Sequence, residues 1–420
     1  MTNRSDADMN VSEDSPTPIT TTSSGRQWYL VPGLVVVVAA GHFFVDLAAS
    51  HVMPLWPELE RYFSLGGNSI YWMYILWSVS TSVTQFVFGY LGDRWRMDRL
   101  IWLAPGLAAI CMGSIGLASS PMMACISIAL GGIFVAAFHP EGAVLSGNAI
   151  PEHRSRALSI FVSGGFIGQM LGPLYGGKIV ELQGIPGLVW SIGGGLVFMV
   201  VLGCGVMFSQ PVARTHIVQA ECLERGQRRC LFWIFCIQAL RTVSATGIPF
   251  SIAFILDARG IGPFGIGVQQ SVFMGGIGLG GLLCGMLFRQ RHERQLLFWL
   301  PLIGAVPLCL LTLCLLMTDD IRLLTVNVAL VALTVGMAIP ITISFGQRLV
   351  PSAPRLASSI AMGVSWGFGA AIAASLTGIT SQWERPELVF VALLITTVAA
   401  GLLSHFLPRE PGDELQGHQT

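Results

Sequence analysis

The sequence predicts an all-α polytopic membrane protein with about twelve transmembrane helices. Its 420 residues are 53% hydrophobic and only 11% charged, with a mean hydropathy of +0.68, whereas soluble domains carry about 25% charged residues. Apolar runs of roughly 18 to 25 residues, the length that crosses a hydrocarbon core, recur along the chain. They cover 30–52, 71–91, 100–119, 122–147, 157–180, 187–208, 230–256, 265–288, 296–317, 321–346, 356–380 and 386–407.

Basic residues are divided unequally between the two ends of these spans. If the N-terminus is cytoplasmic, seventeen arginines lie on its side of the membrane, and four lie opposite: Arg61, Arg259, Arg322 and Arg385. Cytoplasmic loops carry the excess of Lys and Arg in membrane proteins. The sequence therefore predicts a multi-pass protein of the plasma (inner) membrane with both termini in the cytoplasm.

Polar segments divide the chain into two predicted bundles. Residues 1–27, rich in Ser, Thr and Asp and without an apolar stretch, are expected to form a disordered cytoplasmic tail and not a signal peptide. Six-helix bundles follow at 28–208 and 230–408. A polar linker at 209–229 joins them, and residues 409–420 are a second cytoplasmic tail.

The two predicted bundles carry a repeat. Pro140 and Pro340 lie 200 residues apart in corresponding spans. Repeated halves with a site near the bilayer midplane are typical of secondary transporters. Ile339 occupies the position of His139 in the second copy, so the ionisable residues are concentrated in the first half.

The first span carries a histidine and a carboxylate on one face. His42 and Asp46 are four residues apart, which aligns them on a helix. A carboxylate within a span is costly unless it faces protein or a water-filled cavity, so Asp46 is a candidate for proton coupling. The alternative is a carboxylate that only hydrogen-bonds a neighbouring helix. His51 and Glu58 lie nearer the outer end, where we expect solvent to reach them.

The fourth span ends in Phe138-His139-Pro140-Glu141. Pro140 removes a backbone hydrogen bond, and such breaks in spans usually line a cavity. We therefore add His139 and Glu141 to Asp46 as proton-coupling candidates. The alternatives are a packed histidine that is satisfied by its neighbours and a glutamate that is wetted at the cytoplasmic surface.

Arg241 lies inside the seventh span. An alignment of spans one and seven at an offset of 195 residues puts it opposite Asp46. A buried arginine needs a partner or an anionic ligand, so Arg241 is the strongest candidate to hold a negatively charged substrate. The alternative is a structural ion pair with Asp46.

The loop after the second span contains Gly89, Asp93 and Arg94. This spacing resembles the G-x-x-x-D-R-x-G-R-R/K loop of the major facilitator superfamily, although Arg96 replaces the second glycine. The resemblance implies a twelve-helix major facilitator fold of two six-helix pseudo-repeats. It also implies that these three residues latch one conformation; a loop that only sets topology would need the arginines alone.

The fifth span resembles the G-x-x-x-G-P-x-x-G-G motif of drug-exporting members of that superfamily. Small residues four apart let helix backbones approach closely, and a proline bends the helix at the contact. The matching residues are Gly168, Gly172, Pro173, Gly176 and Gly177.

A narrower resemblance is to the fosmidomycin-resistance exporters within the superfamily. It rests on His42-Phe43-Phe44-Val45-Asp46, on Phe138-His139-Pro140-Glu141, on Gly164-Gly165 and on a basic residue in span seven. This resemblance implies a proton-coupled antiporter for small drug-like or anionic compounds that works by alternating access. We assign His42, Gln169 and Arg241 to substrate binding.

The expected partners are a small-molecule substrate, protons and the lipid bilayer, with a monomer as the working unit. We expect no cofactor, no metal, no nucleic acid and no enzyme activity, because the chain has no HExxH, no GxSxG and no nucleotide-binding loop. The nine cysteines form no CxxC pair and indicate packing and not metal binding or disulfides. The alternatives are a proton-coupled uptake symporter for an organic anion, a polytopic membrane enzyme and a non-transporting sensor.

Overall fold

The computed structural model describes most of the chain, and the described residues form helices joined by short turns. They are 33–92, 97, 99–149, 154–207, 225–287, 292–350 and 354–407. The long helices are α1 (Gly33–Ser50), α3 (Ser69–Gly92), α4 (Leu100–Gly113), α5 (Pro121–Ala149), α6 (Arg154–Gln183), α7 (Trp190–Met207), α8 (Arg225–Ala258), α9 (Pro263–Leu287), α10 (Glu293–Met317), α11 (Ile321–Leu349), α13 (Ser365–Gln382) and α14 (Val389–Leu403). The short ones are α2 (Trp56–Tyr62) and α12 (Pro354–Ser359), with a π-helical turn at Ile360–Val364.

The predicted all-α membrane fold is confirmed. Within the described residues, eleven helices are long and apolar enough to cross a bilayer. The remaining expected span, 71–91, is helix α3, which is 24 residues long but less apolar because Ser, Thr and Gln follow one another along it. It packs against α5 and α13, so its polar residues have protein neighbours.

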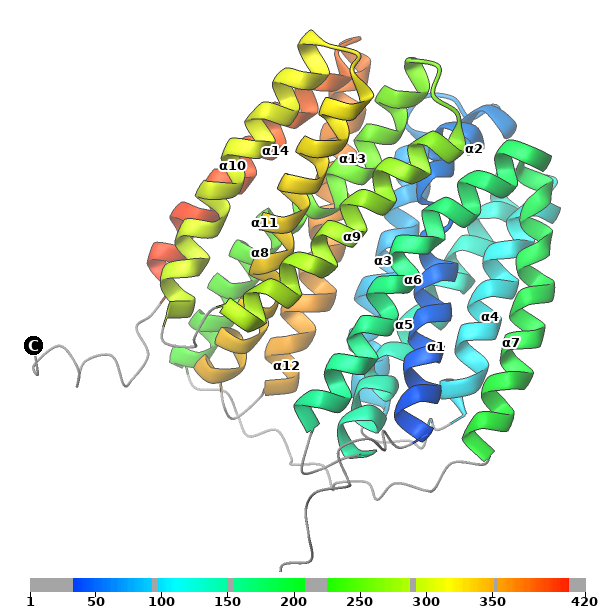
Figure 1. Cartoon of the computed structure of the whole chain (residues 1–420), viewed down its shortest axis with the longest axis horizontal. Helices are drawn as coiled ribbons and strands as arrows, with labels where there is room; N and C mark the ends of the chain where they lie inside the picture. The colour runs from blue at the N-terminus through cyan, green and yellow to red at the C-terminus, as the bar shows by residue number, and fades with distance from the viewer. Residues whose placement is uncertain are drawn as a thin grey trace, which may run out of the picture.

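The helices pair in the same way in the two halves of the chain (Figure 1). In the first half α1 packs against α6, α3 against α5, and α4 against α7. In the second half α8 packs against α13, α9 against α11, and α10 against α14. These are the same pairings of first with fifth, second with fourth and third with sixth span, as the 200-residue repeat leads one to expect.

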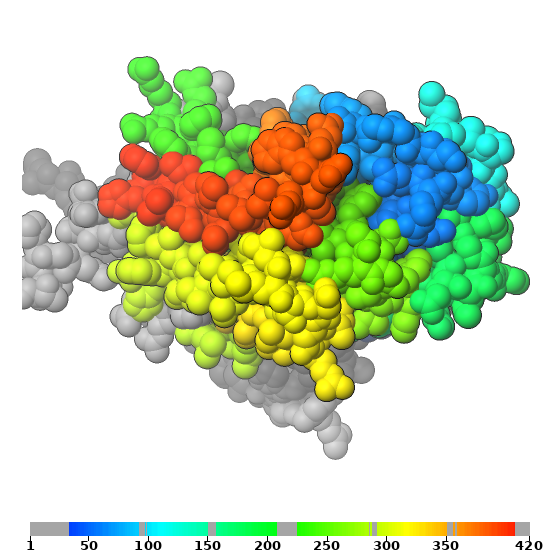
Figure 2. Space-filling view, turned by 90° about the horizontal axis from the view of Figure 1, so that it is seen from above, coloured from blue at the N-terminus to red at the C-terminus, as the bar shows by residue number. Residues whose placement is uncertain are grey.

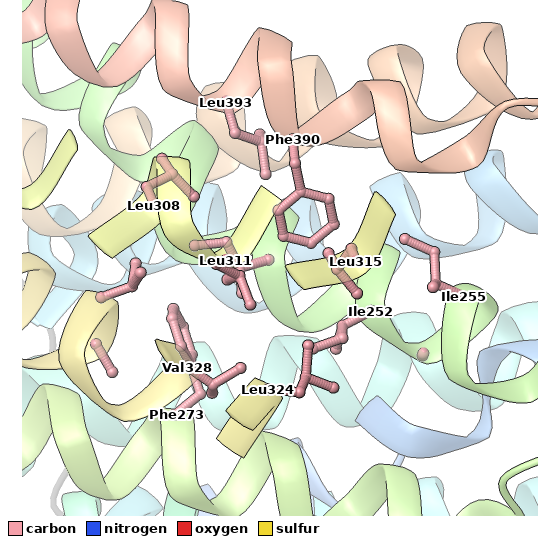
Figure 3. Packing of buried hydrophobic residues seen from close by; sticks show 14 of the residues in the cluster. Ile252, Ile255, Phe273, Leu308, Leu311, Leu315, Leu324, Val328, Phe390 and Leu393 are labelled. Atoms are coloured by element: carbon pink, nitrogen blue, oxygen red, sulfur yellow. The ribbon is translucent and has the colours of Figure 1, made fainter. Parts of the chain in front are cut away.

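The core of the second half is built from side chains of five helices (Figure 3). Phe273 of α9, Leu311 of α10, Val328 of α11 and Phe390 of α14 are each at most 1% exposed, and Ile252 of α8 joins them. Lipid tails are as apolar as these side chains, so close van der Waals packing, and not exclusion from water, holds such a bundle together.

The two ends of the molecule differ. At the end that we call the turn end, short turns at 63–68, 118–120, 259–262, 318–320 and 383–385 join the helices. The start of α1 and the end of α14 both lie at the opposite end of their helices, which we call the termini end; α1 begins at the bottom of Figure 1, and the red segment that follows α14 ends at its left.

The halves meet through α6 with α9 and α3 with α13, and the turn end is closed by polar and aromatic contacts. Arg61 of α2 binds the carboxylate of Asp257 of α8 with both guanidinium nitrogens, at 2.5 and 2.9 Å. Tyr74 of α3 stacks on Phe250 of α8 with ring centroids 3.8 Å apart. Figure 2 looks onto this end, where the orange segment around α13 borders the blue segment of α2 and α3.

Reversing one charge of the Arg61 and Asp257 pair should open the turn end. Arg61→Asp puts three carboxylates together, because Glu58 lies 2.6 Å from the Arg61 guanidinium, and like charges repel. We expect faster hydrogen–deuterium exchange in 56–68 and 256–264 for Arg61→Asp and for Asp257→Arg.

The double variant Arg61→Asp/Asp257→Arg restores the attraction between the halves, and its exchange should return toward that of the unaltered chain. Mass spectrometry of peptides from both segments measures this. Single variants that exchange like the unaltered protein would show that the pair does not hold the end closed.

Candidate functional site

Asp46 lies in the last two turns of α1, near the middle of the 30-residue span Gly33–Tyr62. It is only 3% exposed and has a partner on each side. Its Oδ2 atom is 3.3 Å from His42 Nε2, one helical turn earlier. Its Oδ1 atom is 3.2 Å from His139 Nε2 of α5. The Gln169 side-chain amide of α6 donates a hydrogen bond to Oδ2 at 2.9 Å. Three helices therefore meet at one buried carboxylate, and we call these four residues the Asp46 cluster.

The far side of each imidazole is fixed by a backbone carbonyl. His42 Nδ1 lies 2.7 Å from the Phe161 oxygen, and His139 Nδ1 lies 2.7 Å from the Val135 oxygen. A carbonyl only accepts hydrogen bonds, so both Nδ1 atoms carry a proton. Each Nε2 atom is therefore the variable position of its ring, and each faces Asp46.

The glycines at 164 and 165 let α6 approach this cluster. A Cβ on Gly165 would lie 2.5 Å from the His42 ring and 2.7 Å from Asp46 Oδ2. A Cβ on Gly164 would collide with the Ala39 carbonyl oxygen. The His42 ring is then stacked on Phe161, with ring centroids 4.0 Å apart. The role of the Phe161 carbonyl could not be predicted from the sequence, because every residue type carries the same backbone oxygen.

The structure brings several predicted residues together and separates others. His42 and Gln169, which we expected to contact substrate, both bind Asp46 instead. Glu141 lies further along α5 and is partly exposed. The prediction that solvent reaches His51 is wrong, because its side chain is fully buried. The chain continues past α1 into α2, so His51 lies within a 30-residue span and not at its end.

Arg241 lies on α8 and does not contact Asp46. Its Nη1 atom donates to Thr342 Oγ1 of α11 at 2.6 Å. No carboxylate of the described residues forms an ion pair with it, in contrast to the predicted alternative of a pair with Asp46. The Thr342 hydroxyl is neutral, so the positive charge of Arg241 is not balanced by this contact.

A cavity of about 30 Å³ lies beside Arg241. The Gln238 and Trp366 side chains also line it, and its walls are otherwise mostly aliphatic, with Leu300, Val331 and Val335 among them. The buried Gln238 Oε1 atom has no hydrogen-bond partner among the described residues. Such a volume admits one to three waters, whereas drug-sized ligands occupy about 300 to 1,000 Å³, so the cavity must widen to accept one.

The glycines of the fifth-span motif lie at two helix contacts. A Cβ on Gly168 would collide with the backbone oxygen of Phe43 of α1, and one on Gly176 would collide with that of His51, directly after α1. A Cβ on Gly172 would lie 2.7 Å from the Leu47 oxygen. Gly177 faces α9 instead, where its Cβ would meet the Pro263 backbone. The motif therefore packs α6 between α1 and α9.

The predicted latch is only partly within the described part of the chain. Gly89 lies on α3, where an added Cβ would meet nothing within 4 Å. Asp93 and Arg94 lie outside the described residues.

Sequence reasoning missed a buried ion pair in the second half. Arg348 of α11 lies 2.5 Å from the carboxylate of Glu293 at the start of α10, and Ser344 donates to the same carboxylate at 3.0 Å. Glu293 is 7% exposed. Arg348 is one of the seventeen arginines predicted on the cytoplasmic side. The glutamate at the start of the preceding span was the sequence feature that could have suggested its partner.

Residues 38–225 match the family model of the Major Facilitator Superfamily. Over 389 residues the chain is 23% identical to the "Fosmidomycin resistance protein" of Escherichia coli (strain K12), an alignment that covers 90% of this chain and 93% of that protein. The chain is therefore similar to transporters of the major facilitator superfamily, with the family model matching most of its first half. It is a transporter and not an enzyme, and we refer to it below as the facilitator.

Two further comparisons show similarity to transporters as well. The facilitator is 26% identical over 411 residues to the "Uncharacterized MFS-type transporter YfnC" of Bacillus subtilis (strain 168), covering 90% of this chain and 93% of that one. Its fold is similar to the crystal structure of a bacterial homologue of the human lysosomal transporter Spinster in an inward-facing, occupied conformation. The TM-score is 0.67 at 14% identity, with 89% of this chain and 96% of that chain covered.

Adding a methyl group to the α1 face of α6 should destabilise the facilitator. Gly176→Ala pushes α6 away from α1, and overpacking of this kind costs about 1–3 kcal/mol. Thermal unfolding in detergent, followed by size-exclusion chromatography, should show a lower midpoint. Gly193→Ala in α7 is the control, because nothing lies within 4 Å of its Cβ. Equal midpoints for the two variants would contradict the close α1–α6 contact.

Proposed function

We propose that this facilitator exports a small drug-like or anionic compound across the inner membrane in exchange for protons. The observation that carries the proposal is a division of charge between its halves. The first half holds a carboxylate between two imidazoles. The second half holds Arg241, which lines a cavity and forms no ion pair with a carboxylate of the described residues. Intramembrane ionisable residues of this kind mark ion and substrate pathways.

The Asp46 cluster is the proposed proton carrier. Because both Nδ1 atoms are held by carbonyls, each contact from Nε2 to Asp46 is a hydrogen bond only when a proton lies in it. With two protons the cluster has a net charge of +1, from two imidazoliums and one carboxylate. With one proton it is neutral, and one contact loses its hydrogen bond. The exchangeable proton thus changes both the charge of the cluster and its bonding across α1 and α5.

His139 is the proposed exit point for that proton. Its side chain is 20% exposed, compared with 9% for His42 and 4% for Asp46. Glu141, two residues later and partly exposed, is proposed to pass the proton on to the cytoplasmic side. His42 then serves as a second base for Asp46 and not as a substrate contact.

Arg241 is the proposed anion contact. A guanidinium presents a planar set of donors that suits carboxylate and phosphate groups. The Gln238 amide adds a polar position to a wall that is mostly apolar and also carries the hydroxyls of Thr242, Ser244, Thr334 and Thr397. An anionic head group beside Arg241 and an apolar body against Leu300 and Val335 would match this lining. The pocket must open for such a ligand to enter, as alternating access requires.

Coupling is proposed to come from rocking of the two halves about α6 with α9 and α3 with α13. In this structure the turn end is closed by Arg61 and Asp257. With the arginine-rich termini end in the cytoplasm, the closed end faces outward. Opening it would release the anion outward and let the cluster take up a proton from that side, and return to the present state would release the proton to the cytoplasm. Gly89, Asp93 and Arg94 are proposed to latch the opposite state.

The direction of transport is supported by two observations. The glycine and proline motif of α6 resembles that of exporters, and its residues pack both helix contacts of α6. Two proteins similar to this chain are named "Fosmidomycin resistance protein" and, over 193 residues at 28% identity, "Multidrug resistance protein MdtG" of Escherichia coli (strain 55989 / EAEC). We propose that a monomer suffices, because each half holds its own charged site.

Asp46→Asn and Arg241→Ala should each reduce proton-coupled flux in proteoliposomes by about tenfold or more, because each removes a charged hydrogen-bonding group. The assay imposes a pH gradient and adds fosmidomycin or another small anion. Asp319→Asn, whose side chain is 90% exposed, controls for the loss of a carboxylate. Arg241→Lys keeps the positive charge and should retain more flux than Arg241→Ala.

Proton movement opposite to the substrate, lost in both variants, supports the proposal. Movement in the same direction would make the facilitator an uptake symporter. Full coupled flux in Asp46→Asn would remove the Asp46 cluster from the mechanism, and ligand binding without flux would indicate a sensor.

A further inference from the structure

His42, Asp46 and His139 have the donor set and geometry of a metal site. We propose that these three side chains bind one divalent transition-metal ion of the Zn²⁺ type. The inference goes beyond the proposed transport cycle, since it concerns a second kind of occupant for side chains that the cycle assigns to protons. It holds or fails on metal binding alone.

The three donor atoms are already close enough to share one ion. One ligand atom from each residue lies within 4.8 Å of the other two. His42 Nε2 lies 3.3 Å from Asp46 Oδ2, and His139 Nε2 lies 3.2 Å from the other oxygen, Oδ1. Tetrahedral Zn²⁺ with bonds of about 2.0–2.1 Å holds its ligands about 3.3 Å apart, so rotation of the side chains has to close the wider separations when the ion binds.

The groups that hydrogen-bond these three side chains suit metal binding as well. Metal-ligating histidines almost always donate the other ring N–H to a carboxylate, backbone carbonyl or water. His42 Nδ1 donates to the Phe161 carbonyl and His139 Nδ1 to the Val135 carbonyl, both at 2.7 Å. Gln169 donates to the Asp46 carboxylate at 2.9 Å and orients it. Both Nε2 atoms thereby face the Asp46 carboxylate, one toward each oxygen.

The charge balance favours exchange of the ion for protons. Two imidazoliums and one carboxylate give a net charge of +1. Two neutral imidazoles, one carboxylate and Zn²⁺ give the same net charge, so one ion replaces two protons without adding charge to the bilayer interior. Excess charge there is costly.

The ligand set also predicts which ions bind. Imidazole suits Zn²⁺ and similar transition metals, whereas Mg²⁺ and Ca²⁺ require oxygen ligands in greater number. Three protein ligands leave a fourth position for water. The partial exposure of His139, 20% of its side chain, gives the ion a way in.

Metal binding to the purified full chain, prepared without a polyhistidine tag, tests the inference. Equilibrium dialysis against Zn²⁺, and visible absorption spectra with Co²⁺ as a four-coordinate probe, should give one site per chain. His42→Gln, His139→Gln and Asp46→Asn should each weaken binding more than about tenfold. Each removes an atom that binds the metal directly, which is a larger loss than removing a group that only hydrogen-bonds such a ligand. His405→Gln, an exposed histidine at the termini end, should leave it unchanged.

A further variant keeps the test informative if a substitution prevents folding. His139→Cys retains a ligand atom and should add a thiolate-to-metal charge-transfer band to the Co²⁺ spectrum, which a merely structural role would not produce. Equal binding in all variants would assign the metal to surface histidines and overturn the inference, as would no binding at all. The assay contains no transport substrate, so absence of flux in proteoliposomes leaves its result intact.

Discussion

A carboxylate inside a bilayer span must be satisfied by its neighbours, and much of the first half follows from that constraint at Asp46. Two imidazoles and one amide surround it: His42 comes from α1 itself, and His139 and Gln169 come from helices that have to lie close to α1. The approach of α6 depends on glycines that present no side chain to α1. The histidines depend in turn on backbone carbonyls that fix their ring orientation. Removing any member leaves an unpaired polar group in a medium without water.

The two halves use equivalent helices for opposite charges. In the first, Asp46 of the first span contacts His139 of the fourth span. In the second, Arg241 of the seventh span contacts Thr342 of the tenth. A repeat keeps the path of the backbone and not the side-chain chemistry, so an acidic residue lies in one half and a basic residue lies on the corresponding helix of the other half.

The spans and the shared helix face of His42 and Asp46 could be predicted because they depend on local pattern: run length and four-residue spacing. What could not be predicted depends on contacts between distant segments. The offset alignment set Arg241 against Asp46, but that alignment relates positions within separate bundles and says nothing of distance. His51 was expected to be solvated because the first span was taken to end at residue 52, whereas α2 continues it. The ion pair of Arg348 could not be predicted because its partner, Glu293, lies 55 residues earlier.

Helix α6 is held by backbone contacts on two faces. Toward α1, backbone lies on backbone at Gly168 and Gly176, and the Ser50 hydroxyl lies against Gly172. Toward α9, Gly177 lies against the Pro263 backbone, and Gly267 of α9 lies against the Pro173 backbone in return. A side chain added at any of these positions would separate two helices. Any change in the relative position of the halves therefore has to shift the α6–α9 contact and the α3–α13 contact, while the α1–α6 contact that encloses the Asp46 cluster lies within one half.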